Sequence, residues 1–191
     1  MTEIELKIGA MMQKVYVITT GGTIEKVYQE HTGQVGNIAN KIDRYLRLLR
    51  LPDLRIKATQ LMNKDSLEMT DLDRRRILQT VVEKLKRPAP IVITHGTDTM
   101  VEAGLFLKKH LKRLKVPIIL TGAMTPLGFE GSDGLQNLTE SLLAARLVKP
   151  GVYVVVHNEV FPIDHVRKDR KRARFVWRSE RKAKRRVASG E

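Results

Sequence analysis

Residues 14–24 read Lys-Val-Tyr-Val-Ile-Thr-Thr-Gly-Gly-Thr-Ile, and their pattern is the first indication of the fold class. Residues 14–20 form a short run of β-branched and aromatic side chains, which is typical of a buried strand, and Gly21-Gly22 marks the turn that follows it. The pattern of a buried strand returns further along the chain. We predict additional strands over residues 55–62, 91–94, 117–122 and 152–156.

Amphipathic segments alternate with these runs. Thr70 and Asp73 form a sequence like a capping box at the start of one of them, and Asn40 can cap another. Helices are predicted over residues 41–49, 71–85, 98–114 and 133–148, whereas residues 27–37 have no period and are predicted to form a loop. Buried strands that alternate with amphipathic helices indicate an α/β fold, a parallel sheet with helices on both faces.

The composition limits the possible classes of protein. A chain of 191 residues is long enough for one domain, and the absence of cysteine excludes disulfides, thiolate nucleophiles and cysteine zinc sites. Residues 1–10 lack the features of a signal peptide, and the longest apolar runs are far shorter than the roughly 20 residues that cross a bilayer. We therefore expect a cytoplasmic protein without a membrane span.

Positive charge is concentrated near the end of the chain. Residues 167–191 contain twelve Lys and Arg and three Asp and Glu, whereas the preceding 166 residues contain 23 and 18. The sequence thus predicts an α/β domain over residues 1–166 and a basic tail over residues 167–191. The tail is either solvated or a patch for nucleic acid or another polyanion, in which Trp177 could stack on a base.

Three of the predicted strands are followed by loops rich in hydroxyl groups. These loops begin at Thr19, Thr94 and Thr121. In a parallel sheet such loops meet at one edge, where ligands bind. A threonine hydroxyl can attack a carbonyl when a base removes its proton, and Gly21 and Gly96 are expected to bring backbone N–H groups close to a substrate. The arrangement favours attack on a carbonyl group.

Each loop also has a simpler interpretation. Gly-Gly-Thr after a strand is often only a turn, and His95-Gly-Thr-Asp is an ordinary helix start. Neither the Walker pattern nor Gly-x-Gly-x-x-Gly follows the first strand, so nucleotide binding has little support. Neither loop is sufficient alone to define a catalytic site.

Taken together, the two motifs have a specific resemblance. Thr20-Gly-Gly-Thr-Ile and His95-Gly-Thr-Asp-Thr-Met, about 75 residues apart, resemble the two signature segments of the bacterial-type L-asparaginases. Segments around Asp65-Ser66, Gly122-Ala123-Met124 and Ser132-Asp133-Gly134 are similar to family segments in the same order. The resemblance covers about residues 14–168, nearly the whole amino-terminal domain of that family.

This resemblance implies hydrolysis of L-asparagine to L-aspartate and ammonia through an acyl-enzyme, with no metal and no organic cofactor. Thr20 resembles the primary nucleophile, and Tyr28 lies in the loop where the family places a tyrosine beside it. Thr97 resembles the second catalytic threonine, and Lys168 aligns with the lysine that serves as its base. Glutamine is the competing substrate, being one methylene longer.

Two further residues resemble groups that bind the substrate. Ser66 resembles the residue that binds the substrate carboxylate, and Asp98 the acid that holds the substrate ammonium group. Leu67 follows Ser66 where some members have glutamine, which removes one polar contact.

The resemblance also implies a difference from the family. Members usually have a second domain that completes the site of a neighbouring subunit with an acidic residue, whereas this sequence ends about 23 residues after Lys168. A homo-oligomer, either a dimer or a tetramer, is expected. Two non-enzymatic alternatives remain open, namely a module that binds nucleic acid or another polyanion and a sensor that binds asparagine without turnover.

Overall fold

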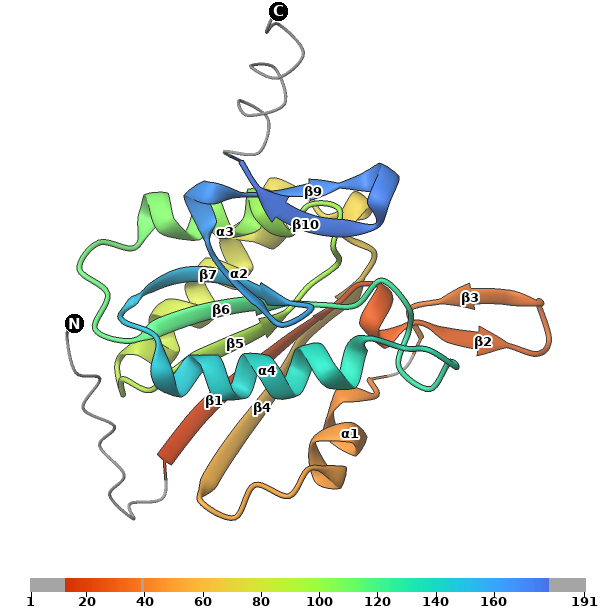
Figure 1. Cartoon of the computed structure of the whole chain (residues 1–191), viewed down its shortest axis with the longest axis horizontal. Helices are drawn as coiled ribbons and strands as arrows, with labels where there is room; N and C mark the ends of the chain where they lie inside the picture. Colours follow the sequence, from red (N-terminus) through yellow and green to blue (C-terminus); the bar gives the residue numbers. More distant parts are fainter. Residues whose placement is uncertain (1–12, 39, 179–191) are drawn as a thin grey trace, which may run out of the picture.

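A six-stranded sheet runs through the centre of the computed structural model, which describes residues 13–38 and 40–178 (Figure 1). The strand order is β4-β1-β5-β6-β7-β8, in which the first five strands are parallel and β8 pairs antiparallel with β7. The strands comprise β1 (Gln13–Gly21), β4 (Leu54–Lys64), β5 (Ile91–Thr94), β6 (Pro117–Thr121), β7 (Gly151–Val156) and β8 (Glu159–Pro162).

Four helices cover the two faces of this sheet. They are α1 (Ile42–Leu48), α2 (Asp71–Leu85), α3 (Met100–His110) and α4 (Gly134–Leu147). Ile77 of α2 and Met100 of α3 pack in one apolar core, whereas Ile42 of α1 and Leu138 of α4 pack in the core on the opposite face. The predicted α/β class, with helices on both faces, is confirmed.

Local signals in the sequence place several of these elements correctly. Helix α2 begins with a capping box, in which Thr70 accepts from the backbone N–H of Asp73 and the Asp73 carboxylate accepts from that of Thr70. Asn40 Oδ1 accepts from the backbone N–H of Ile42 at 2.9 Å at the start of α1. Strand β5 and helix α2 have the predicted bounds, and α3 is shorter than predicted.

The strand order reverses between β1 and β5. After β1 the chain forms β4 on one side of it, and then returns to the other side to form β5, β6 and β7 in turn. The loops that leave β1 and β5 therefore diverge at their carboxyl ends, which is where ligands bind in open parallel sheets.

Residues 27–37 differ from the predicted loop. They contain a hairpin of β2 (Val27–Gln29) and β3 (Gln34–Gly36), which protrudes from the body of the molecule (Figure 1). Its strands are only three residues long and contain glycine and amide side chains. The sequence therefore shows no alternation of apolar residues that would predict them. None of the helices within the described part of the chain is long and apolar enough to cross a membrane.

The first part of the expected basic tail is folded. Residues 166–177 form the hairpin of β9 (Val166–Asp169) and β10 (Arg174–Trp177), which lies beside α3 (Figure 1). Phe175 is 3% exposed, and the Trp177 ring lies 5.1 Å from the Phe161 ring. The tail boundary at residue 167 is thus not a boundary of the fold, because apolar contacts distant in sequence anchor the hairpin. Residues 179–191 lie outside the described residues.

Candidate functional site

The site is built where β1 and β5 end side by side. Thr19 pairs with Thr94 in the parallel ladder, so the residues that follow them, Thr20 and His95, lie side by side. Gly22 has φ 82°, and a Cβ added to it would lie 2.3 Å from Gly96 Cα. The two loops approach this closely because both positions lack a side chain.

Thr20 lies at the end of β1 with its side chain fully buried. Its hydroxyl donates a hydrogen bond of 2.7 Å to the backbone carbonyl of Thr94. This bond connects the candidate nucleophile to the neighbouring strand and restricts its rotamer, as a preorganised group requires.

A lysine distant in sequence meets the loop after β5. Lys168 Nζ, on β9, donates to Thr97 Oγ1 at 2.6 Å and lies 3.0 Å from Asp98 Oδ1. The Lys168 side chain is 15% exposed and Thr97 is buried. Arg170 Nε lies 3.5 Å from the same Asp98 oxygen. The structure thus brings Lys168 to two residues that lie about 70 positions before it in the sequence.

Ser66 packs against the same loop from the end of β4. It is buried, and a Cβ added to Gly96 would lie 2.5 Å from Ser66 Oγ, so that only glycine allows this approach. The backbone carbonyl of Ser66 accepts from Thr99 Oγ1 at 2.9 Å. Leu67 projects outward and is 67% exposed.

Lys26 and Asp65 form an ion pair of 2.6 Å beside Ser66, which the sequence did not suggest. Burial acts to raise the pKa of Asp65, but Lys26, the Leu67 amide and the charge of Lys168 outweigh it and lower the pKa. The pair joins the loop after β1 to the loop after β4.

Tyr28 is placed differently from the other candidates. It lies on β2 of the protruding hairpin with 57% of its surface exposed. Among the described residues its hydroxyl forms no hydrogen bond, either with Thr20 or with any other group. In this conformation the structure does not bring Tyr28 to the buried hydroxyl of Thr20.

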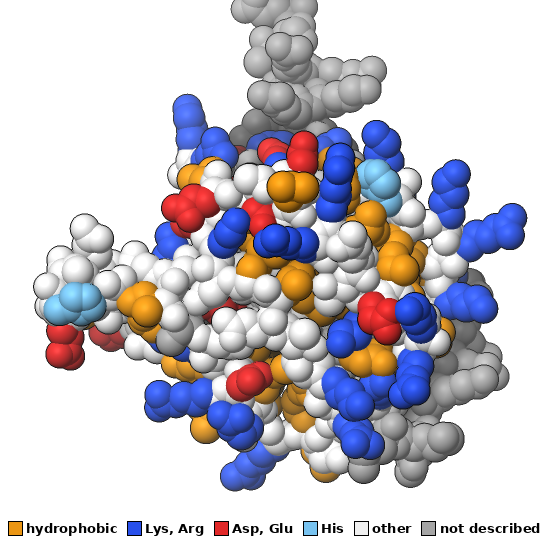
Figure 2. Space-filling model, turned by 180° about the vertical axis from the view of Figure 1, so that it is seen from behind, with side chains coloured by type: hydrophobic (Ala, Val, Ile, Leu, Met, Phe, Trp, Pro, Cys, Tyr) orange, Lys and Arg blue, Asp and Glu red, His pale blue; other side chains and the backbone are white. Residues whose placement is uncertain are grey.

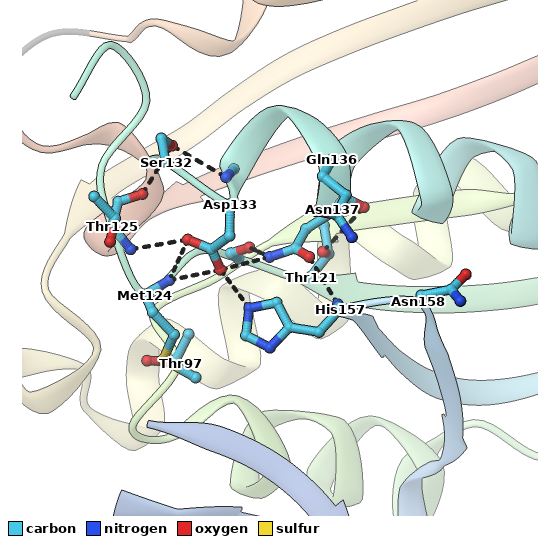
Figure 3. A network of polar contacts seen from close by, with 12 residues as sticks. Thr97, Thr121, Met124, Thr125, Ser132, Asp133, Gln136, Asn137, His157 and Asn158 are labelled. Carbon is cyan, nitrogen blue, oxygen red and sulfur yellow. Dashed lines mark hydrogen bonds and ion pairs between the residues drawn. The ribbon is translucent and has the colours of Figure 1, made fainter. Parts of the chain in front are cut away.

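A polar network centred on Asp133 holds the loop after β6 beside Thr97 (Figure 3). The Asp133 carboxylate accepts from the amides of Met124 and Thr125 at 3.0 and 2.9 Å, and His157 Nε2 lies 2.7 Å from it. Burial acts to raise the pKa of Asp133, but these hydrogen bonds outweigh it and lower the pKa. Asp133 is therefore a carboxylate that holds the backbone of the loop after β6 in place, a role that the sequence pattern did not identify.

His95 is buried at the start of the same loop. Its Nδ1 lies 2.8 Å from the carbonyl of Gly96, and burial lowers the pKa of the ring to about 4. The ring is consequently neutral near pH 7. Within the part of the chain that the structure describes, no group of three or more His, Cys, Asp and Glu could hold a metal ion.

Comparison with known proteins identifies the family. The model of the asparaginase amino-terminal domain matches residues 14–185. The chain is 31% identical over 147 residues to an L-asparaginase of Thermococcus kodakarensis. The aligned region covers 77% of this chain and 45% of that protein. It is 29% identical over 163 residues to a glutaminase-asparaginase of Acinetobacter glutaminasificans, covering 81% and 49%.

The solved structure of the thermostable L-asparaginase from Thermococcus kodakarensis superposes with a TM-score of 0.76 at 30% identity, over 86% of this chain and 51% of that one. The chain spans about half the length of these relatives, and the matched half is their amino-terminal domain. The chain therefore belongs to the asparaginase family and corresponds to its amino-terminal domain.

Proposed function

We propose that this protein hydrolyses the side-chain amide of L-asparagine to give L-aspartate and ammonia, without a metal or an organic cofactor. The observation that carries the proposal is the contact of Lys168 with Thr97 and Asp98 at the strand reversal where Thr20 also lies. A hydroxyl, an amine in contact with a second hydroxyl, and a carboxylate are the groups that amide hydrolysis by a threonine requires.

In the proposed reaction, Thr20 Oγ attacks the amide carbon and its proton passes to a base. The proposed base is Lys168, which receives this proton through Thr97, whose Oγ1 lies 2.6 Å from Lys168 Nζ. Ammonia then leaves with a proton returned by the base, and water cleaves the threonyl ester to release aspartate. The N–H groups of Gly21 and Gly96 are the proposed donors that stabilise the developing negative charge.

The substrate is proposed to be held by charge at both ends of its backbone. Asp98 binds the ammonium group, and Ser66 binds the carboxylate. Tyr28 joins the site only when the hairpin of β2 and β3 moves toward Thr20. We further propose that the protein is cytoplasmic and forms a homo-oligomer, as the resemblance to the L-asparaginases implies.

The test is a coupled ammonia assay on the purified protein. L-asparagine should release ammonia, and L-glutamine should be discriminated against by about 10- to 200-fold, which corresponds to one methylene. Release from neither amide would contradict the proposal. Thermal stabilisation by asparagine without ammonia would instead indicate a sensor, because a ligand that binds only the folded state stabilises it.

A second candidate function, binding of nucleic acid, is favoured by the distribution of charge. The described residues contain 29 Lys and Arg and 17 Asp and Glu, so the excess belongs to the folded body as well as to residues 179–191. Figure 2 shows basic side chains over one face of the molecule. Exposed cations also gather on the hairpin beside Asp98, namely Arg170, Lys171, Arg172, Arg174 and Arg178.

Binding of single-stranded RNA at several salt concentrations tests this candidate. Replacing Lys171, Arg172 and Arg174 together with glutamate should lower the slope of log affinity against log salt by about three, one for each lost phosphate contact. The matched control replaces the exposed Arg44, Arg47 and Arg50 instead. Equal slopes for the two variants would exclude the hairpin of β9 and β10 as the RNA-binding site. Trp177 is not proposed to stack on a base, because it packs against Phe161.

A further inference from the structure

Glu25 is a carboxyl group buried next to the site, and no step proposed above uses it. It ends the 3-10 helix Thr23–Glu25 that follows Gly21-Gly22, and it is 0% exposed. Neither of its oxygens has a hydrogen-bond partner among the described residues. An ionised carboxylate in such surroundings is costly, and a buried polar group without a partner requires an explanation.

Two threonine hydroxyls surround this carboxyl group. Thr19 and Thr94 are paired across β1 and β5, and their hydroxyls lie near enough to the carboxyl group to lower the pKa of Glu25. Thr94 Oγ1 is itself buried without a partner in the part of the chain that the structure describes. A protonated carboxyl group that donates to one of these hydroxyls would satisfy groups that are otherwise unpaired.

Thr94 connects this buried cluster to the candidate nucleophile. Its side chain lies on the side of Glu25, while its backbone carbonyl accepts the hydrogen bond of Thr20 at 2.7 Å. A change at Glu25 is therefore two contacts away from the Thr20 hydroxyl, through a residue that both groups share.

We infer that the protonated carboxyl group of Glu25 donates a hydrogen bond to the hydroxyl of Thr94 or Thr19 and thereby positions Thr20 for amide hydrolysis. The inference rests on the proposed function for its consequence in catalysis, and on the buried contacts alone for its structural part. Glu25 is a positioning residue, because it touches neither the substrate nor the reacting atoms.

The charges around Glu25 favour the protonated form. The pKa of Glu25 is raised from 4.5 to about 7, because burial raises it by more than the hydroxyls of Thr19 and Thr94 lower it, and the charge of Asp43 on α1 adds to the rise. Lys41, before α1, forms no ion pair with Glu25 among the described residues, and its Nζ donates to the carbonyls of Lys26 and Leu127. The facing side chains of β1 and β5 are threonines.

The direction of the pH effect follows from this shift. Between pH 4.5 and about 7 the unfolded chain has lost the Glu25 proton while the folded protein keeps it, so stability falls as the pH rises. Above about pH 7 both states are ionised and the effect is constant. The ionisation of Glu25 should therefore raise the equilibrium constant for unfolding by about 300-fold between pH 4.5 and about pH 7.

Two variants separate positioning from simple burial. Glu25→Gln keeps a hydrogen-bond donor that does not titrate, and Glu25→Leu keeps the volume without a donor. We expect wild-type kcat for ammonia release to fall more steeply above pH 7 than kcat of Glu25→Gln. Glu25→Leu should lose kcat by about tenfold at pH 6 with KM nearly unchanged, and Glu25→Gln should restore it. Glu30→Gln, exposed beyond β2, is the control.

A measurement without substrate distinguishes failure of the inference from failure of the proposed function. The Gly22 amide donates to the Lys64 carbonyl at 2.8 Å at the end of β1, and its hydrogen exchange at pH 8 should be at least tenfold faster in the wild type than in Glu25→Gln. This difference in exchange without any ammonia release would contradict the proposed hydrolase activity but support the positioning role of Glu25. Equal exchange, or identical pH profiles of kcat, would overturn the inference.

Discussion

Replacement of Lys168 with methionine is expected to lower kcat for ammonia release by about a thousandfold, within the range typical of a lost general base. Methionine keeps the apolar stem of lysine but removes the amine that lies 2.6 Å from Thr97 Oγ1 and 3.0 Å from Asp98 Oδ1. Steady-state assays at saturating asparagine measure the effect, with Thr20→Ala as the background without a nucleophile.

Two comparisons make this result specific. Lys171→Met changes an exposed lysine of the same hairpin and should leave kcat within twofold of the wild type. Lys168→Arg keeps the positive charge near Asp98 but cannot be deprotonated, and should remain as inactive as Lys168→Met. A loss of less than tenfold in Lys168→Met would show that the base lies elsewhere.

Replacement of Phe175 with alanine is expected to lower the free energy of unfolding by about 3–5 kcal/mol, the usual cost of removing a buried phenylalanine. Phe175 is 3% exposed and belongs to the same apolar core as Val166 and Phe161. Urea denaturation measures the change, which should appear as a lower midpoint at a similar slope.

The neighbouring residue provides the control. Arg174 is exposed on the same strand, and Arg174→Ala should change stability by less than about 0.5 kcal/mol. If Phe175→Ala were equally mild, the hairpin would behave as a solvated tail beginning at residue 167, and Lys168 would not be held beside Thr97.

Much of the central fold could be predicted because its signals are local. The buried strand at residues 91–94 consists of consecutive apolar and β-branched residues, and the helix at residues 71–85 begins with its own capping box. Such signals depend on neighbours within a few positions. The hairpin of β9 and β10 has no comparable signal, because its many arginines resemble a solvated segment and its anchors contact Phe161 across the fold.

Local sequence patterns identify the loops that carry the candidate chemistry, since threonines and glycines follow strands whose carboxyl ends must meet in a parallel sheet. The distances between the groups of the site depend on the packing of the folded chain. The tertiary structure placed Lys168 at Thr97 through a hairpin that packs on α3, and it left Tyr28 exposed. It also buried Glu25, which in the sequence is an ordinary charged residue before a lysine. Burial and contact depend on chain segments far apart in sequence, and no local pattern encodes them.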